Sequence, residues 1–553
     1  MAQNGPRPVL IALVALIPLR LFNAYIAGVA DCDETYNYWE AVQLLAGSNA
    51  HRRPLQTWEY APAFALRSWA YVVPYAAVAR LFNENAFLVV RLAAVALSFV
   101  LAEVCLVRGV YVRFGPRAAW ALLGLLVCSA GHAAAAPALV PSATCAMLAM
   151  FAQGCWLQNW NRGAVFLAVL ATLWPGWPFV AVLFVPLAMD VVHTECGTRG
   201  VARGFAYVLL LGVVCGLMVG LPCALFDVRA YGRMTSPLWN VLAYNVEAGG
   251  DELYGVAPWT YYAKNLGLNA GVAVVLVLAL PLTLLLRHVL VRDPRRPALT
   301  ALKHAAPAVL WIAVLLGRPH KEERFLFPAF PSLYVGAAVS LDALAEAAGA
   351  LGARFVRPAT TKNSITYITL VVAACLGFAR VAALAVYYDH GQMTAWRAAA
   401  AISAKLPQDA TICVGGEWHR FPGTFLLPPT SRLGFVRSDF DGQLPRAYAY
   451  DADPLATAAR NVSNFNGANR GEENVYMAPS ECDVAVDLRL GGDKPMMIAD
   501  SRTWTQVHAS PFLDAARTPA LARAFLIPGY SLRRAQFGEY VVHIPAEHFM
   551  RIY

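Results

Sequence analysis

Acidic residues gather directly after the first hydrophobic run of the sequence. The stretch DCDETYNYWE places Asp31, Asp33 and Glu34 within four residues, and Glu40 and Glu59 follow. A carboxylate at a boundary between water and lipid is costly, and a partly desolvated one near a hydroxyl can act as a general base. An ordinary solvated loop beside a membrane would carry the same residues, so this stretch alone leaves both interpretations open.

Asp31 and Asp33 also have the D-x-D spacing with which sugar-nucleotide transferases hold a divalent metal ion. Carboxylate oxygens are the ligands that Mg²⁺ prefers. However, the match is only three residues long, and it lies beside an apolar run rather than after a strand of a nucleotide-binding domain. The spacing therefore gives weak support to a metal site.

Cations gather in a second stretch, RPHKEERFLFP, which lies between two apolar runs. Arginine and lysine at a membrane boundary suit a lipid-linked phosphate, because they bind its oxygens and stabilise the charge of a departing phosphate. A charged turn whose ion pairs contribute little to stability would look similar. The polar residues of this stretch are Arg318, His320, Lys321, Glu322, Glu323 and Arg324.

Aromatic residues accompany the acidic ones. The stretch LQTWEYAPAFALRSWAYVV begins at Leu55 and contains Trp58, Glu59 and Tyr60, while Tyr36 lies in the first acidic stretch. Such residues suit either an interfacial belt or the apolar face of a sugar. The pattern around Trp58 predicts an amphipathic helix along the membrane interface.

The elements that position these residues are membrane helices. Of 553 residues, 58% are hydrophobic and 14% are charged, and the mean hydropathy is +0.48. This composition predicts an integral membrane protein. The net charge of +9 does not indicate a nucleic-acid partner, because the basic residues lie in short loops between apolar runs, as in cytosolic loops of membrane proteins.

About eleven apolar runs are long enough to serve as packed membrane spans. The first could also be a signal peptide ending at AGVAD, but Arg20 interrupts it and its length favours an uncleaved anchor. The expected spans are Pro8–Gly28, Ala86–Val107, Ala118–Ala134, Val140–Trp156, Gly163–Trp174, Phe179–Val192, Phe205–Leu225, Leu266–Leu286, Ala305–Leu316, Phe327–Leu344 and Ile365–Tyr387.

Lysine and arginine predict the orientation of these spans. Alternate loops carry most of the basic residues, for example Arg108 and Arg113 or Arg199 and Arg203, and should be cytosolic. The acidic stretch, the cation-rich stretch and the C-terminal region then face the opposite side.

The C-terminal region, residues 388–553, differs from the membrane region, residues 1–387. Short β-like runs such as ATICVGG, DVAVDLRL and EYVVHIP are separated by turn residues, which predicts a small α/β domain. It holds Cys413 and Cys482, which an oxidising compartment would allow to pair, and the N-glycosylation sequon at Asn461. Two buried free thiols remain the alternative.

A polytopic transporter or lipid flippase is a further alternative. Such proteins often show internal repeats and charged residues near the middle of the membrane. No repeat is evident here, although Arg91 and Glu103 lie within one expected span. They are more than three helical turns apart, so direct pairing requires a partner on another helix.

Taken together, DCDETYNYWE, QTWEYAPAFALRSWAY and HKEERFLFP resemble the eukaryotic α-1,2-mannosyltransferases of the asparagine-linked glycosylation pathway, which depend on dolichyl phosphate mannose. The tail segments GGEWHRFPGTFLLP, GQLPRAYA and SPFLDAART are similar to the same family. The resemblance extends from about residue 31 to near residue 540.

The resemblance implies a GT-C fold in the endoplasmic reticulum membrane, with the active site and the C-terminal domain in the lumen. It implies transfer of the seventh and ninth mannoses, with inversion, from dolichyl phosphate mannose to a dolichyl-diphosphate-linked oligosaccharide. The α-1,6-mannosyltransferase of that pathway and the mannosyltransferases of glycosylphosphatidylinositol assembly are alternatives within the family.

The resemblance also implies roles for individual residues. Asp33 would be the base, with Glu34 as the second choice, and no metal or other cofactor is expected because the donor is a lipid monophosphate. His320, Lys321, Arg324 and Arg318 would bind the donor phosphate. Expected substrate contacts are Tyr36, Trp58, Glu59, Tyr60, Glu322 and Glu323. The sequence indicates no oligomeric state.

Overall fold

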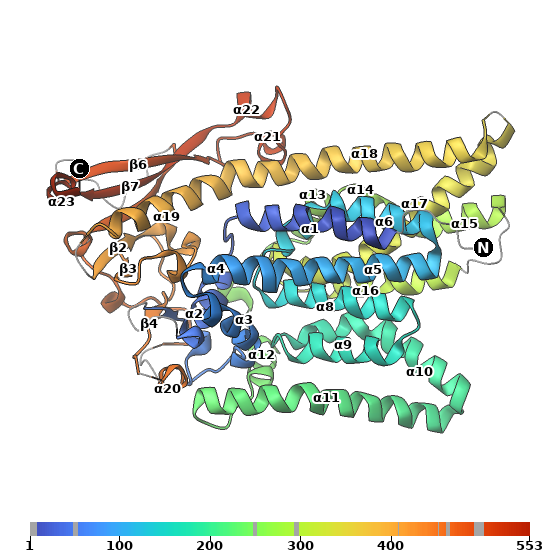
Figure 1. The fold of residues 1–553 in the computed structure, drawn as a ribbon, viewed down its shortest axis with the longest axis horizontal. Coiled ribbons are helices and arrows are strands. Elements are labelled where there is room, and N and C mark those ends of the chain that lie inside the picture. The colour runs from blue at the N-terminus through green and yellow to red at the C-terminus, as the bar shows by residue number, and fades with distance from the viewer. Residues whose placement is uncertain are drawn as a thin grey trace. The chain divides into compact units, whose positions relative to one another are not determined.

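The computed structural model describes residues 8–47, 53–246, 251–291, 298–354, 356–406, 409–451, 453–460, 465–491 and 503–552. The chain divides into two compact units (Figure 1). Unit 1 comprises residues 1–24, 95–223 and 242–380, and unit 2 comprises residues 25–94, 224–241 and 381–553. The C-terminal region therefore forms one unit with the acidic stretch, whereas the sequence suggested a boundary at residue 387. The sequon at Asn461 lies outside the described residues.

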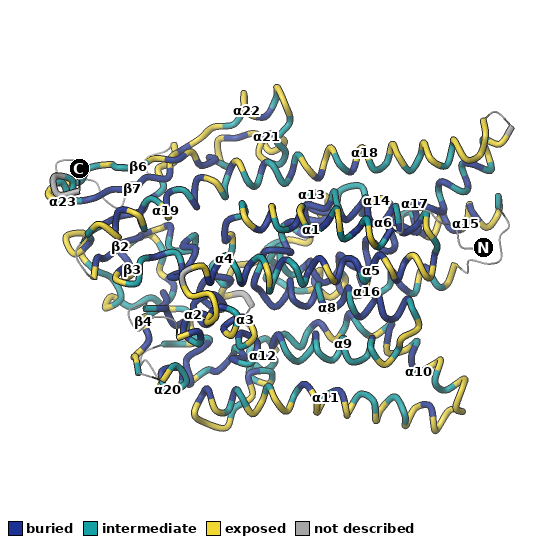
Figure 2. Tube along the Cα trace, in the orientation of Figure 1, coloured by how far each residue is buried: buried dark blue, intermediate teal, exposed yellow. Residues whose placement is uncertain are grey.

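Seven helical segments of the described chain are long and apolar enough to cross a membrane, or eight if one bent pair counts as a span. The apolar stretch of Val201–Tyr231 is only 11% buried, whereas that of Glu323–Leu351 is 94% buried. Figure 2 shows the exposed residues along α11 and α18. Several of the other expected spans correspond to shorter apolar helices, including Pro116–Val127, Asn161–Leu173 and Leu280–Val291.

Unit 1 is helical. Its helices α5 and α8 approach closely at two glycines, since a Cβ on Gly109 would lie 2.9 Å from the carbonyl oxygen of Gly154. Small residues permit such close packing of membrane helices. The helices with most or all of their residues in this unit are α1 (Pro8–Ile26), α5 (Leu97–Phe114), α6 (Pro116–Val127), α7 (Ala130–Ala135), α8 (Pro141–Leu157), α9 (Asn161–Leu173), α10 (Val185–Arg199), α11 (Val201–Tyr231), α13 (Thr260–Ala270), α14 (Val272–Leu278), α15 (Leu280–Val291), α16 (Ala298–Leu316), α17 (Phe330–Leu351) and α18 (Pro358–Leu384).

The expected span Leu266–Leu286 is not one helix, which corrects the sequence prediction. The axes of α13 and α14 differ by 112°. The break lies at Gly271, whose φ of +51° is in the left-handed region that favours glycine. The sequence around Gly271 is apolar enough for one span despite Asn269, so hydropathy alone gave no sign of the bend.

Unit 2 contains a five-stranded sheet of order β3-β2-β5-β7-β6. Strands β2, β3 and β5 are parallel, and β7 is antiparallel to β5 and β6. The expected strand runs coincide with β2, β5 and β7, which confirms a mixed α/β arrangement. The strands are β2 (Ala410–Val414), β3 (Ser431–Phe435), β5 (Val484–Arg489), β6 (Trp504–Leu513) and β7 (Phe537–Pro545), and a two-stranded sheet pairs β1 (Leu55–Gln56) with β4 (Arg446–Ala447).

Helix α19 (His390–Ser403) covers this sheet with an apolar face. Trp396 and Ala399 belong to one buried cluster with Val484 and Val542. The helix continues α18 through a π-helical segment, so the segment Pro358–Ser403 extends 46 residues. The expected span ended at Tyr387 because hydropathy falls there, although the helix does not end.

The remaining elements of unit 2 are short. They are η1 (Glu34–Trp39), α2 (Glu40–Ala46), η2 (Trp58–Tyr60), α3 (Trp69–Phe82), η3 (Asn83–Asn85), α4 (Ala86–Val89), η4 (Val90–Ala96), α12 (Pro237–Val246), η9 (Ala385–Asp389), η10 (Gly416–Arg420), η11 (Thr424–Leu426), α20 (Pro454–Ala459), η12 (Glu473–Val475), η13 (Pro479–Glu481), α21 (Ala520–Ala524), α22 (Ser531–Arg534) and α23 (Ala546–Ile552); η4 and α12 extend past the division between the units.

The segment before α3 is not the amphipathic helix that the sequence suggested. Residues 55–68 form β1, η2 and tight turns, and Ala65 has a φ of +46°. Helix α3 begins at Trp69, where the carboxylate of Asp227 accepts hydrogen bonds from the Ser68 hydroxyl (2.8 Å) and the Ala70 N–H (3.2 Å). A carboxylate from α11 thus satisfies the free N–H end of α3, which a sequence pattern cannot show.

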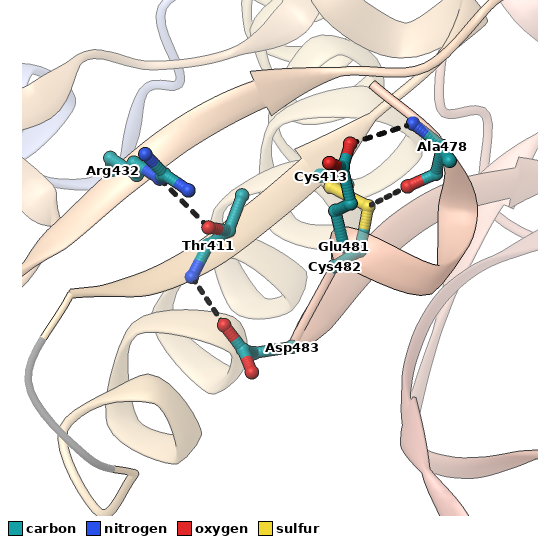
Figure 3. Close-up of a disulfide and its surroundings, with 7 residues drawn as sticks. All are labelled: Thr411, Cys413, Arg432, Ala478, Glu481, Cys482 and Asp483. Carbon is teal, nitrogen blue, oxygen red and sulfur yellow. Dashed lines mark hydrogen bonds between the residues drawn. A yellow bond between two sulfur atoms is a disulfide. The ribbon is translucent and has the colours of Figure 1, made fainter.

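The structure joins Cys413 of β2 to Cys482, the pair suggested by the sequence (Figure 3). The two residues are 69 positions apart, and their Cα atoms are separated by 5.7 Å. Nearby, the Thr411 N–H donates to Asp483 at 2.7 Å. The bond therefore fixes the start of β5 beside β2.

Glu40 connects three distant parts of unit 2 at one buried carboxylate. It is fully buried and accepts hydrogen bonds from the N–H of Leu55 (2.8 Å), the N–H of Thr424 (2.7 Å) and the hydroxyl of Thr424 (2.9 Å). Burial raises the pKa of this carboxyl to about 7, although the three donors oppose the shift.

Loss of the disulfide should destabilise unit 2. Closing a loop of this length contributes about 4 kcal/mol in the chain-entropy description, so the double variant Cys413→Ala, Cys482→Ala should melt at a clearly lower temperature than wild type in detergent. Cys375→Ala, which removes an exposed free thiol, is the matched control. Equal melting temperatures for the double variant and wild type would contradict the prediction.

Glu40→Gln should change how stability depends on pH. The Glu40 carboxyl titrates near 4.5 when unfolded and near 7 when folded, so the folded state holds its proton more tightly. The stabilisation of the folded state by this tighter proton binding is complete below the unfolded pKa of 4.5, and it is lost as the pH rises through the folded pKa of about 7. Glutamine does not titrate, and its amide places N–H groups against an existing donor, which costs about 1–3 kcal/mol.

Thermal unfolding from about pH 5 to about pH 8 checks this. The variant should be less stable throughout, and the melting temperature of wild type should fall more steeply with pH than that of the variant. Parallel curves would show that Glu40 has no shifted titration.

Candidate functional site

The acidic stretch forms a turn that leads into a π-helix. Asp31, Cys32 and Asp33 are half-buried, and the Asp33 N–H donates to Asp31 Oδ1 at 2.9 Å. The helix η1 follows immediately, and its six residues are all buried. π-Helical segments are rare and often occur at functional sites. The turn thus keeps two carboxylates accessible at the start of an otherwise buried element.

Asp33 and Glu34 have different surroundings. Glu34 is 4% exposed, and one of its oxygens accepts a hydrogen bond from the Trp39 indole at 3.0 Å. Its charge also interacts with that of Arg91. A base must reach the hydroxyl from which it takes a proton. The half-buried Asp33 meets this requirement better than Glu34.

A second carboxylate, Glu59, faces the acidic turn. One oxygen accepts from the Arg67 guanidinium at 2.7 Å, and the other accepts from the Asn37 amide of η1. Burial raises the pKa of Glu59 and the charge of Asp33 adds to this, whereas Arg67 and Asn37 oppose it. Arg67 also interacts electrostatically with Asp33.

Arg67 was not among the residues predicted for the site. The sequence grouped it with an interfacial helix, where an arginine is unremarkable. Its place beside Asp33 and Glu59 results from the turns of residues 55–68, which no local periodicity reveals. Arg67 is therefore the cation that the structure adds to the acidic turn.

Two of the predicted substrate contacts have packing roles instead. Tyr36 is 3% exposed and donates to the Trp418 carbonyl at 2.8 Å, and Tyr60 is fully buried against Trp69. Their ring faces are covered by protein, so neither offers a surface to a sugar. Trp58 and Glu59 are half-buried and remain accessible.

The cation-rich segment lies in unit 1 and is internally paired. Glu322 binds both His320 (3.1 Å) and Arg324. Lys321 donates to the Arg318 carbonyl and lies 5.7 Å from the centre of the Tyr262 ring. Glu322 therefore takes part in ion pairs within the segment, and its contact with substrate stays a prediction.

Glu323 is engaged as well. It accepts a hydrogen bond from the side-chain amide of Asn269 at 2.8 Å, at the end of α13. On the other side, the Arg318 guanidinium donates to the Asn245 carbonyl at 3.1 Å, and His320 contacts the Gly255 carbonyl at 3.0 Å. Both sides of the segment are therefore fixed to residues of α12 and α13 and to Gly255 between them.

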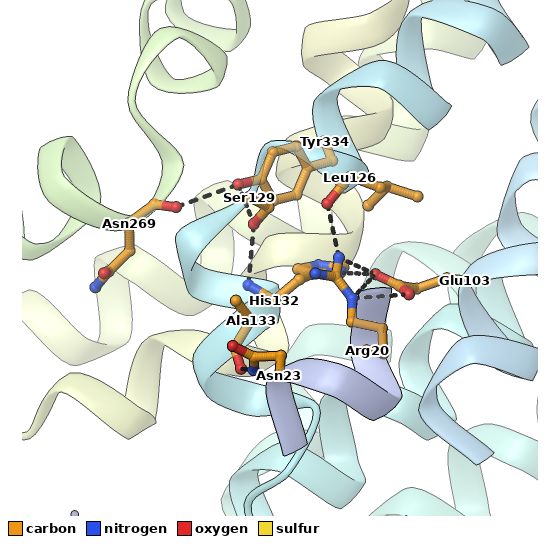
Figure 4. A network of polar contacts seen from close by, with 9 residues as sticks. All are labelled: Arg20, Asn23, Glu103, Leu126, Ser129, His132, Ala133, Asn269 and Tyr334. Carbon is orange, nitrogen blue, oxygen red and sulfur yellow. Dashed lines mark hydrogen bonds and ion pairs between the residues drawn. The ribbon is translucent and has the colours of Figure 1, made fainter. Parts of the chain in front are cut away.

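A buried polar network supports Asn269 from inside the helical unit (Figure 4). Arg20 of α1 pairs with Glu103 of α5 at 2.7 Å, and Glu103 also contacts His132 at 2.7 Å. The His132 N–H donates to the Ser129 hydroxyl (2.9 Å). The Ser129 and Tyr334 hydroxyls are hydrogen-bonded to each other (2.6 Å), and the Tyr334 hydroxyl also lies 3.4 Å from the Asn269 carbonyl oxygen.

The structure also shows how Arg91 and Glu103, the two charged residues within one expected span, find partners. Glu103 has its partner on another helix, Arg20, as its spacing from Arg91 required. Arg91 donates instead to the carbonyls of Ala27 (2.7 Å) and Gly28 (2.6 Å). Both charges are thus paired and buried, as polar groups in membrane helices must be.

The structure therefore assembles the predicted site as two constellations. Asp31, Asp33, Glu34 and Glu59 lie together in unit 2. The cations of the segment from Arg318 to Arg324 lie together with Glu322 and Glu323 in unit 1.

Several relatives match most of the length of the chain. It is 33% identical to the mouse protein named alpha-1,2-mannosyltransferase ALG9, over 97% of this chain and 88% of that one. It is 28% identical to the protein of that name from Saccharomyces cerevisiae, over 90% of this chain and 88% of that one. It is 27% identical to the one from Arabidopsis thaliana, over 98% of this chain and 92% of that one.

Among solved structures, the fold is similar to that of ArnT from Cupriavidus metallidurans bound to undecaprenyl phosphate. The TM-score is 0.55 at 16% identity, covering 82% of this chain and 87% of ArnT. The apo form of ArnT gives a TM-score of 0.52 at 15% identity, covering 86% of this chain and 92% of ArnT. The expected GT-C fold is thereby confirmed.

The Alg9-like mannosyltransferase family matches residues 11–428. This range includes both the acidic turn and the cation-rich segment. The chain belongs to the Alg9-like mannosyltransferase family.

Proposed function

We propose that this glycosyltransferase transfers mannose from dolichyl phosphate mannose, in α-1,2 linkage, onto the dolichyl-diphosphate-linked precursor of N-glycans. The names of its full-length relatives support the linkage. The observation that carries the proposal is the accessible Asp33 at the start of a buried π-helix, with Glu34 engaged beside it. The products are the precursors with seven and nine mannoses.

The proposed reaction is a single displacement with inversion. The 2-hydroxyl oxygen of the acceptor mannose attacks C1 of the donor mannose, opposite the phosphate. The bond from C1 to the phosphate oxygen breaks, dolichyl phosphate departs with the electron pair, and the hydroxyl proton passes to Asp33. A positioned base of this kind contributes about 10²–10⁴-fold to the rate.

The leaving phosphate requires positive charge more than a proton. We assign this role to the cations of the segment from Arg318 to Arg324. Glu322 already pairs with His320 and Arg324, so a donor phosphate would compete with Glu322 for the same guanidinium and imidazole. The pairing holds His320 and Arg324 in place before the donor binds, and donor binding would exchange the Glu322 carboxylate for phosphate oxygens.

Transfer is proposed to be independent of metal. The ligand atoms of Asp31, Cys32 and Asp33 lie within 4.8 Å of one another. A thiol between two carboxylates is a mixed donor set, whereas Mg²⁺ prefers oxygen ligands alone. A metal at Asp33 would also occupy the lone pairs that the proposed base needs.

The enzyme is proposed to act in the endoplasmic reticulum membrane, with the acidic turn and the C-terminal region in the lumen. The disulfide between Cys413 and Cys482 supports a lumenal position for that region, because disulfides persist in oxidising compartments.

The first test of the function is mannose transfer by purified protein. Wild type with dolichyl phosphate mannose and an acceptor carrying six mannoses should give an α-1,2-linked product with seven, and a chelator should have no effect. Asp33→Asn should lower kcat by about 10²–10⁴-fold. Asp439→Asn, at an exposed position of unit 2, should behave as wild type.

Each other outcome removes one part of the proposal. Loss of transfer with chelator would show that the Asp31–Asp33 turn needs a metal. An active Asp33→Asn would exclude that residue as the base and favour Glu34. An α-1,6-linked product would contradict the linkage.

The cation-rich segment gives a separate prediction. Arg324→Gln should lower kcat/KM for the donor by about 10²–10³-fold, as removal of one group that stabilises developing charge typically does. The KM for the acceptor should change little. Arg357→Gln, at an exposed position outside the segment, is the matched control. A raised acceptor KM with unchanged donor kinetics would place the segment at the acceptor instead.

A further inference from the structure

The backbone that leads into the acidic turn is held on several sides. Arg91 donates to the carbonyls of Ala27 and Gly28, and the Asp389 carboxylate accepts the Gly28 N–H. A Cβ on Gly28 would lie 3.0 Å from Asp389 Oδ1. The side-chain amide of Gln392 donates to the Val29 carbonyl at 3.1 Å. The last of these contacts is two residues before Asp31.

The backbone that leaves the turn is held by the loop from Gly416 to Leu426. The Thr35 hydroxyl donates to the Phe421 carbonyl at 2.8 Å, and the Tyr36 hydroxyl donates to the Trp418 carbonyl at 2.8 Å. Asp33 thus lies between two anchored segments, and its own position follows from theirs.

Gln392 connects these two anchors. Its amide nitrogen donates to the Val29 carbonyl and also to the Arg420 carbonyl at 2.5 Å. An amide nitrogen has two hydrogens, so both have an acceptor. Gln392 is 3% exposed, and a buried side chain with both donors satisfied has little freedom to move.

The loop is itself fixed to the sheet. Arg420 donates to both oxygens of Glu417 at 2.8 and 2.7 Å, and the Tyr540 hydroxyl of β7 also donates to Glu417. Glu417 is 8% exposed and Tyr540 is fully buried. The carbonyl of Arg420 therefore offers Gln392 a rigid point of attachment.

We propose that Gln392 is a positioning residue for the reaction, because its amide joins the entry of the acidic turn to the loop that holds the exit. This inference rests on the proposed function, in which Asp33 is the base. Gln392 does not contact the substrates in this role. It fixes the position of the Asp33 carboxylate relative to the acceptor hydroxyl. A displacement of about 1 Å between such reacting groups can lower the rate by about 10²-fold.

The test compares Gln392→Glu with wild type. Glutamate keeps the length and shape of the side chain but has no N–H donor. We expect kcat to fall by about 10–100-fold, with the KM for donor and acceptor within about threefold of wild type. Hydrogen exchange of residues 27–36 should become faster. Arg397→Ala, at an exposed position of the same helix, should change neither quantity.

Two further variants keep the test decisive. Thr35→Val removes one hydroxyl donor at the exit, and it should lower kcat less than Gln392→Glu; it carries the test if Gln392→Glu does not fold. In the Asp33→Asn background, Gln392→Glu should add little to the loss, because a residue that acts through the base has no effect once the base is absent.

Unchanged kcat in Gln392→Glu, a raised KM with unchanged kcat, unchanged exchange of residues 27–36, or a full additional loss in the Asp33→Asn background would each overturn the inference. Failure of the proposed function is a different result, seen as no mannose transfer by wild type or full activity of Asp33→Asn. In that case the exchange data still decide whether Gln392 fixes the turn.

Discussion

The position of the acidic turn depends on a carboxylate that takes no part in the proposed chemistry. Glu40 lies just beyond η1 and receives three hydrogen bonds from residues that are 15 and 384 positions away in the sequence. Taking a carboxylate out of water is costly unless donors replace the water. Since Leu55 and Thr424 supply these donors only in the folded arrangement, the same bonds that pair Glu40 also bring the first loop and the loop after β2 together.

A related constraint operates inside the helical unit. Arg20, Glu103 and His132 are buried among apolar helices, where polar groups without partners are strongly unfavourable. Their pairing joins α1 and α5 to the short helix α7, and the Tyr334 hydroxyl extends the hydrogen bonds to the carbonyl of Asn269. Because Asn269 in turn holds Glu323, the cation-rich segment is supported by the interior of the unit as well as by its own ion pairs.

Local patterns predicted those parts of the molecule that depend on local sequence. The apolar runs, the strand runs and the two charged segments could all be located, since each is a property of neighbouring residues. The break at Gly271 could not, because the flanking apolar residues suit a straight helix and a bent pair equally well. The pairing of Arg20 with Glu103, across 83 positions, and the approach of Arg67 to the acidic turn arise from tertiary packing that no periodicity encodes.

Burial separates the acidic residues of the first loop into different roles. Asp31 and Asp33 remain half-buried at the turn, whereas Glu34 and Glu40 are covered and occupied by donors. Arg67 forms an ion pair with Glu59 and also interacts electrostatically with Asp33, so its charge acts on both carboxylates. Because Glu59 holds the Arg67 guanidinium at 2.7 Å, one positive charge acts on two carboxylates and stabilises the ionised form of the acidic turn.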